Sequence, residues 1–173
     1  MPPARLPYRA EIHDAGTACD GRRLGLYPMD DGAAMRLAPL VAAIGPWAHY
    51  GYSAATLAAF LNEEMGEAHR FSIQCGSEIA GAVVVRYPWL AGPYLQMLAI
   101  LPAFQRHCIG EHSLDWYAAE ARAAGQRQVW LCVSGVNAGA QRFYRAHGYE
   151  LTTTLDNLMR DGDDELLMRR RLV

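Results

Sequence analysis

The chain has 173 residues, of which 51% are hydrophobic and 20% are charged, so we expect one packed globular domain. The formal net charge of -2 gives no electrostatic basis for binding a phosphate backbone or an anionic membrane. Neither nucleic acid nor a membrane is therefore an expected partner. All 16 basic residues are arginine, and the absence of lysine excludes a Walker-type phosphate loop, a kinase strand lysine and a Schiff-base lysine.

The four cysteines, Cys19, Cys75, Cys108 and Cys132, are far apart in the sequence and form no Cys-x-x-Cys pair. They are not accompanied by a nearby histidine pair that would complete a zinc-ligand set, so we expect reduced thiols and no metal. The N-terminal segment has no apolar signal region, and no run of about 18 apolar residues occurs. These features predict a soluble, cytoplasmic protein.

The first half of the chain predicts an arm, a strand, two helices and a meander. Residues 1–22 show no sustained period and are predicted as an N-terminal arm, either mobile or paired as an edge strand at 8–12. Residues 23–173 are predicted as the single domain. The elements expected in order are a strand at 24–27, a helix that begins after Asp31 and ends at 44, a helix at 54–65, and antiparallel strands at 71–75, 79–87 and 94–101.

The second half predicts a helix at 109–124, a strand at 129–133, a helix at 137–147 and a terminal hairpin at 150–155 and 166–172. This order indicates an α/β fold with a mixed sheet covered by helices. Arg169, Arg170 and Arg171 in the last strand are expected to be solvated.

Two segments carry the functional information. In residues 98–111 an apolar strand stops at Pro102, and a short loop then enters a helix. Unpaired N–H groups of such a loop and helix start form an anion site suited to a pyrophosphate, and Gly110 allows close approach. In residues 137–149, Asn137 can cap a helix whose one face carries Ala140, Phe143, Tyr144 and His147.

These segments resemble the GNAT superfamily of acyl-CoA-dependent N-acyltransferases. The family patterns are Gln/Arg-x-x-Gly-x-Gly/Ala in the loop and Asn-x-x-Ala-x-x-Phe-Tyr-x-x-x-Gly-Phe/Tyr in the later helix. The helix matches at every position, and the loop matches at Gln105 and Gly110 but has Cys108 in place of the first glycine. Element order extends the resemblance over 24–172, whereas the motif match is confined to 98–149.

The resemblance implies a six- to seven-stranded, mostly antiparallel sheet with about four flanking helices and a splayed central strand. It implies an N-acetyltransferase that moves an acetyl group from acetyl-CoA to a primary amine of a small molecule or protein, by direct attack in a ternary complex. Tyr144 is similar to the family's general acid. The coenzyme A site implied by the resemblance comprises Leu98, Ala99, Ile100, Gln105, Arg106, His107, Cys108, Ile109, Gly110, Glu111, Asn137, Ala140 and Phe143.

The chemistry explains why a tyrosine suits this role. The departing thiolate must collect a proton, which a phenol of pKa near 10 can supply, and a strand N–H such as that of Leu98 can hold the developing oxyanion. The attacking amine must lose a proton, but no motif identifies the base. Residues considered for the acceptor side are Tyr94, Gln96, Glu67, His69 and Ser134.

Other interpretations remain open at this stage. A coenzyme A-binding sensor without turnover is the main alternative, and a cysteine-dependent enzyme acting through Cys108 is a weaker one. The segment Pro46 to Tyr50 is expected either to cover the acceptor pocket or to pack in the core. The acceptor is not readable, and exposed sheet edges allow a homodimer.

Overall fold

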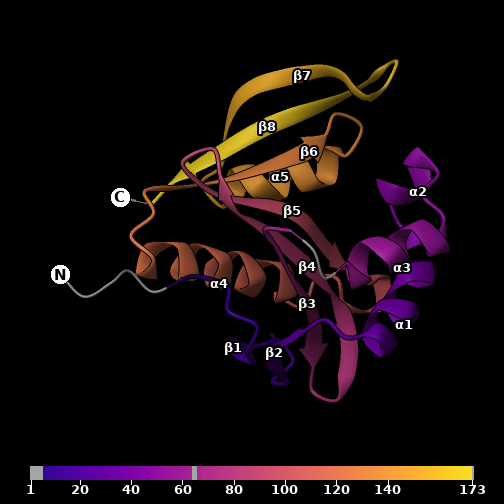
Figure 1. Cartoon of the computed structure of the whole chain (residues 1–173), viewed down its shortest axis with the longest axis vertical. Coiled ribbons are helices and arrows are strands. Elements are labelled where there is room, and N and C mark those ends of the chain that lie inside the picture. Colours follow the sequence, from indigo (N-terminus) through magenta and orange to yellow (C-terminus); the bar gives the residue numbers. More distant parts are fainter. Residues whose placement is uncertain (1–5, 64–65, 173) are drawn as a thin grey trace.

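The computed structural model describes residues 6–63 and 66–172 and shows one sheet flanked by helices (Figure 1). The strands are β1 (His13–Thr17), β2 (Arg23–Pro28), β3 (Ala68–Cys75), β4 (Glu78–Trp89), β5 (Gly92–Ile100), β6 (Gln128–Ser134), β7 (Glu150–Arg160) and β8 (Asp163–Arg171). The helices are α1 (Asp31–Ala42), α2 (Trp47–Tyr50), α3 (Ala54–Asn62), α4 (Ile109–Ala123) and α5 (Ala138–Ala146), with a short 3-10 helix at Pro102–Phe104.

The sheet confirms the predicted fold class. Its strand order is β1-β2-β3-β4-β5-β6-β8-β7, and every neighbouring pair is antiparallel except β5 and β6. Alternating apolar residues in β3 and the longer apolar run of β4 form the predicted meander with β5. The described residues form one strand and one helix beyond those predicted, namely β1 and the short helix α2. Neither segment has a sustained periodic pattern.

The described part of the predicted N-terminal arm packs against the domain through Pro7 and Tyr8, which are buried. Tyr8 is fully buried, and its hydroxyl donates a hydrogen bond to the carbonyl of Tyr117 on α4 at 2.9 Å. The strand of this segment is β1 at His13–Thr17, which pairs with β2, rather than the 8–12 strand considered above. Residues 1–5 of the predicted arm lie outside the described residues, as does Met65 at the predicted end of the second helix.

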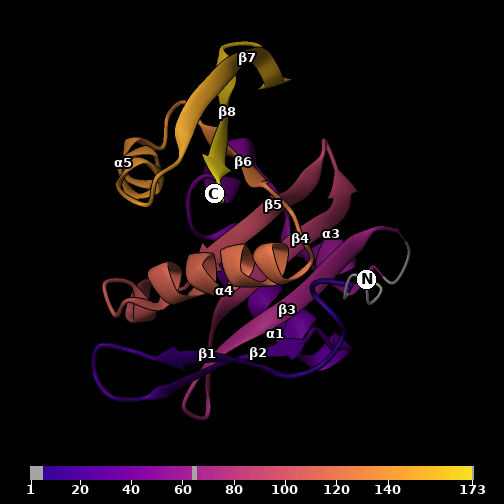
Figure 2. The ribbon, with the colours of Figure 1, turned by 90° about the vertical axis from the view of Figure 1, so that its left-hand side faces the viewer.

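The helices cover both faces of the sheet (Figures 1 and 2). Helix α4 lies across one face, where Trp116 packs against Phe71 of β3 with ring centroids 5.3 Å apart. Helices α1 and α3 pack against each other on the opposite face, with Leu37, Val41 and Leu61 buried.

Strands β5 and β6 pair over only a short distance and then separate. Their register contains only Tyr94 with Trp130 and Leu95 with Leu131. A register shift opposite Val84 and Val85 leaves Gln96 without a partner in β4, and bulges of this kind bend a strand. The later part of β5 therefore keeps its pairing with β4 but presents an open edge toward β6, which is the splayed strand predicted above.

Candidate active site

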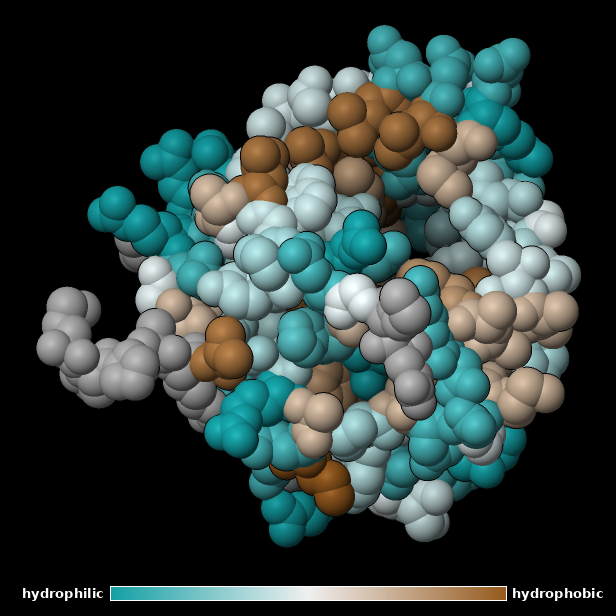
Figure 3. Space-filling view, viewed as in Figure 1, coloured by the Kyte–Doolittle hydropathy of each residue, from teal (hydrophilic) through white to brown (hydrophobic). Residues whose placement is uncertain are grey.

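A cavity of about 1300 Å³ occupies the opening between the separated strands. It extends from the start of α4 to the β7–β8 hairpin, and the space-filling view shows the surface hollowed between that hairpin and α2 (Figure 3). Large clefts at such strand separations are the usual place for a bound substrate.

The loop before α4 presents a row of free backbone donors to this cavity. Arg106 and Cys108 adopt left-handed conformations, with φ of 62° and 63°, between residues that do not. The N–H groups from Arg106 to Glu111 donate to no acceptor within the described chain. Alternating handedness directs successive N–H groups to one side, an arrangement in the loop and the first turn of α4 that is suited to an anion.

Cys108 is not a reduced thiol as predicted, because it forms a disulfide with Cys19. The two residues are 89 positions apart in sequence, but the turn between β1 and β2 lies beside the loop, and their Cα atoms are 5.7 Å apart. The N–H of Cys19 also donates to the carbonyl of His107 at 3.2 Å. Sequence spacing gave no sign of this contact. Cys75 and Cys132 have free thiols, as predicted.

The predicted coenzyme site residues converge on the cavity, with one exception. His107 does not line it, and its Nδ1 lies 3.1 Å from a carboxylate oxygen of Asp20 in the β1–β2 turn. The Gln105 amide donates to the carbonyl of Ile100 at 3.1 Å, which ties the loop to the end of β5. The predicted residues that line the cavity are Leu98, Ala99, Ile100, Gln105, Arg106, Cys108, Ile109, Gly110, Glu111, Asn137, Ala140, Phe143 and Tyr144.

Helix α5 begins as the sequence predicted. The side-chain oxygen of Asn137 accepts a hydrogen bond from the N–H of Ala140 at 3.1 Å. Phe143 faces α4, and a Cβ on Gly110 would lie 3.1 Å from its ring. The packing of Phe143 is therefore a second reason for a glycine at position 110, in addition to the close approach of a phosphate to the backbone.

Tyr144 has the features expected of a proton donor. It lies on α5, lines the cavity and is 9% exposed. Its hydroxyl makes no hydrogen bond with the described residues, whereas the hydroxyls of Tyr8 and Tyr117 bond to backbone carbonyls. Burial raises the pKa of Tyr144 to about 12, so the phenol keeps its proton at neutral pH.

The far end of the cavity contains a second cluster, of which the sequence indicated Ser134 and, within the segment Pro46 to Tyr50, Tyr50, but not Glu165. Tyr50 of α2 lies 2.6 Å from the hydroxyl of Ser134 on β6 and donates to Glu165 on β8 at 2.5 Å. Ser134 and Glu165 face each other in the β6–β8 register. Because α2, β6 and β8 are far apart in the sequence, Glu165 could be assigned to this cluster only once the sheet order was known.

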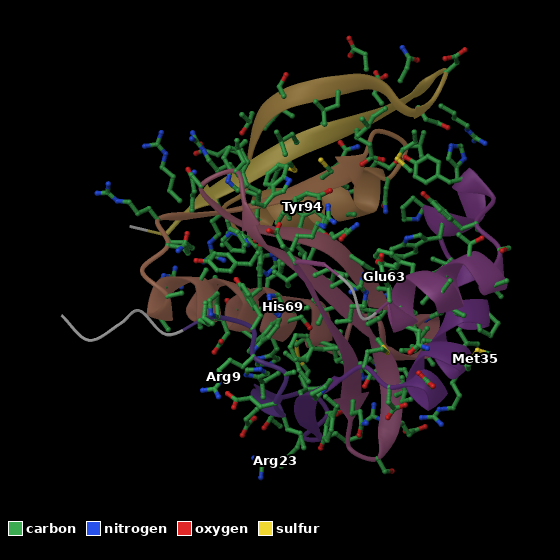
Figure 4. All side chains as sticks on the ribbon, viewed as in Figure 1. Arg9, Arg23, Met35, Glu63, His69 and Tyr94 are labelled. Atoms are coloured by element: carbon green, nitrogen blue, oxygen red, sulfur yellow. A yellow bond between two sulfur atoms is a disulfide. The ribbon has the colours of Figure 1, made fainter. Side chains whose placement is uncertain are left out.

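The other residues considered for the acceptor side divide into two groups. Tyr94 and Gln96 line the cavity, as does Ser134. Glu67 and His69 do not: His69 packs against Tyr8 with ring centroids 6.0 Å apart, and Figure 4 shows it well below Tyr94. The segment from Pro46 to Tyr50 borders the cavity through Pro46, Trp47 and Tyr50.

Two further findings concern the described residues. No helix there has the length and apolar character needed to cross a membrane. No group of three or more His, Cys, Asp or Glu side chains in that part of the chain could hold a metal ion.

Solved structures of acetyltransferases share this fold. A GNAT-family acetyltransferase from Desulfovibrio desulfuricans superposes with a TM-score of 0.73 at 19% identity, over 87% of this chain and 99% of that one. The ribosomal-protein-S18-alanine N-acetyltransferase of Escherichia coli gives 0.67 at 19% identity, over 86% and 94%. An aminoglycoside 6'-N-acetyltransferase complexed with coenzyme A gives 0.68 at 15% identity, over 86% and 97%.

Comparison with curated protein sequences finds no match. The sequence model of the GNAT acetyltransferase family, in contrast, matches residues 35–149, which is more than half of the chain and includes both motif segments. Together with the separated strands, the anion loop and the unpaired tyrosine, this match shows that the chain belongs to the GNAT family of acetyltransferases.

Proposed function

We propose that this protein is an N-acetyltransferase that moves an acetyl group from acetyl-CoA to a primary amine by direct attack in a ternary complex. The observation that carries the proposal is the Tyr144 hydroxyl, which lines the cavity, stays protonated and has no hydrogen-bond partner in the described chain. A buried phenol left unpaired in a large cleft is suited to a reacting partner.

The described residues fit acetyl-CoA at both of its ends. The free N–H groups from Arg106 to Glu111 suit the pyrophosphate, and the open edge of β5 from Leu98 to Ile100 suits the amides of the pantetheine arm. Coenzyme A is bound in one of the fold relatives, the aminoglycoside acetyltransferase. In the proposed reaction the amine nitrogen forms a bond to the acetyl carbon, the carbon–sulfur bond breaks, and Tyr144 protonates the leaving sulfur.

The test compares two tyrosines whose rings are 5.8 Å apart. Tyr144→Phe removes the proposed acid, so we expect kcat with an amine panel at pH 7 to fall by about 100-fold or more, while acetyl-CoA still binds. Tyr149→Phe is the matched control, because the Tyr149 hydroxyl is buried without a partner and Tyr149 does not line the cavity. Its activity should stay at the wild-type level.

Thiol release measures turnover, and calorimetry measures acetyl-CoA binding. Equal loss of activity in both variants, or none in Tyr144→Phe, contradicts the assigned acid. Binding without turnover of any amine contradicts the enzyme and leaves the coenzyme A sensor as the better interpretation.

A further inference from the structure

Glu165 is a buried carboxyl group that faces the cavity without a cationic partner. It is 7% exposed, lies at the start of β8 and lines the acceptor end of the cavity. Its side chain accepts a hydrogen bond from Tyr50, and no arginine or histidine of the described chain pairs with it. A buried carboxylate without a counter-ion is costly, so such a group in an open cavity is suited to a cation supplied by a ligand.

A chain of two hydroxyl groups, of which only that of Tyr50 contacts the carboxylate, holds Glu165 in one orientation. Tyr50 has a single hydroxyl proton, which it donates to Glu165 at 2.5 Å, so the 2.6 Å contact with Ser134 is donated by the serine. The resulting chain runs from Ser134 through Tyr50 to one carboxylate oxygen, and it leaves the second oxygen of Glu165 without a protein donor in the described chain.

The neighbouring Asp163 differs in this respect, although it lies on the same strand. One of its oxygens is 2.8 Å from Nε2 of His49, and the other forms an ion pair with Arg160. The hydrogen bonds from His49 and Arg160 hold the pKa of Asp163 below its usual value. Asp163 is therefore already neutralised by the protein, which leaves Glu165 as the carboxyl of the two with capacity for a ligand.

We propose that Glu165 binds the ammonium group of the acceptor and accepts its proton, so that the site selects amines protonated at neutral pH over neutral alcohols. This assignment rests on the proposed acetyl transfer. Tyr50 and Ser134 are positioning residues that act through Glu165.

The protons balance in this scheme. The substrate ammonium gives one proton to the Glu165 carboxylate and becomes a neutral nucleophile, which attacks the acetyl carbon. When the carbon–sulfur bond breaks, Tyr144 gives its proton to sulfur, and the second proton lost by nitrogen restores the phenol. Glu165 then releases its proton to water, so each turnover yields the amide, the thiol and one proton.

The surroundings make Glu165 a better proton acceptor than an exposed carboxylate. Burial, followed by the charge of Asp163, raises the pKa of Glu165, whereas the hydrogen bond from Tyr50 lowers it. The other titratable groups near it are Tyr94 on β5 and Cys132 on β6, and burial raises the pKa of each, so both are neutral. Beyond Asp163 stand His49 of α2 and Arg160 of β7.

The decisive variant is Glu165→Gln, which keeps the size of the side chain and its ability to accept from Tyr50. Spermidine, glucosamine and a peptide with a free N-terminal alanine serve as amines, and the alcohol analogue of the best amine serves as the neutral probe. We expect kcat/KM for the amine to fall at least 100-fold at pH 7, with recovery toward high pH as free amine accumulates. The affinity for acetyl-CoA should change less than twofold.

Glu150→Gln is the matched control, because Glu150 is an exposed carboxyl at the start of β7 and does not line the cavity. Calorimetry of each amine with the coenzyme A complex gives a readout that needs no turnover. Amine binding that weakens at least tenfold in Glu165→Gln, but not in Glu150→Gln, supports the site even if acetyl transfer fails. The assignment is overturned if wild type and Glu165→Gln bind or turn over the amine equally well. It is also overturned if the alcohol binds as well as its amine, or if no amine binds at all.

Discussion

The two ends of the cavity are built in different ways. At the end where we propose that coenzyme A binds, called the coenzyme end, the loop 105–111 and the start of α4 offer main-chain N–H groups, and one short stretch of sequence supplies them. At the end proposed for the amine, called the acceptor end, the hydrogen-bonded cluster consists of side chains of Tyr50, Ser134 and Glu165, which come from three separate elements. The coenzyme end therefore depends on local backbone conformation, and the acceptor end depends on the packing of distant elements.

This difference has a functional meaning. Main-chain donors are the same whatever the side chains are, so a backbone site can bind one invariant ligand group in many sequences. A side-chain site can change its chemistry with one substitution, as Glu165 illustrates by placing a carboxyl opposite Ser134. Variants that affect one end only are the way to test whether the two ends are independent.

The largest effect is expected from the disulfide at the coenzyme end. Cys19→Ser removes the link between the β1–β2 turn and the loop, which closes 89 residues of chain, and should destabilise the fold by about 2–4 kcal/mol. The loop should also become less ordered, so the KM for acetyl-CoA should rise several-fold while the KM for the amine stays constant. Thermal unfolding and steady-state kinetics measure both.

Reductant provides the control for this variant. It should lower the melting temperature of the wild-type protein to that of Cys19→Ser and leave Cys19→Ser unchanged. A wild-type protein that is insensitive to reductant, or a rise in the amine KM, is inconsistent with a role confined to the coenzyme end.

A smaller effect is expected from Tyr50→Phe at the acceptor end. The Tyr50 hydrogen bond lowers the pKa of Glu165, so its loss raises that pKa further and reduces the ionised fraction at a given pH. The acid limb of kcat/KM for the amine should move to higher pH, with a loss that is largest on the acid side and shrinks as the pH rises. A pH profile checks this, and an unchanged limb or an altered KM for acetyl-CoA contradicts it.

The smallest effect is expected at the start of α5. Asn137→Ala removes the side-chain cap bonded to the N–H of Ala140 and should lower the free energy of unfolding by about 1 kcal/mol. Asn137→Asp keeps the acceptor oxygen and should retain most of the stability. Denaturant unfolding measures the difference, and equal losses in the two variants would show that the cap oxygen is not the cause.

The same contrast explains what the sequence could predict. The strand and helix order, the anion loop and the Asn137 cap follow from periods and turn chemistry within short segments. The Cys19–Cys108 disulfide and the Tyr50–Glu165 contact join segments 89 and 115 residues apart, respectively. No local pattern specifies such pairs, because they arise only when β8 pairs with β6 and β1 comes beside the start of α4.

The position of β7 at the sheet edge has a consequence for how this site could evolve. Glu165 belongs to β8, which is anchored to β6 by seven residue pairs, whereas β7 pairs with β8 alone and is largely exposed. Insertions or exchanges in β7 and its turn can therefore reshape the wall above Glu165 without disturbing the core. The hairpin can act as an interchangeable module that gives new acceptors access to the same carboxyl group.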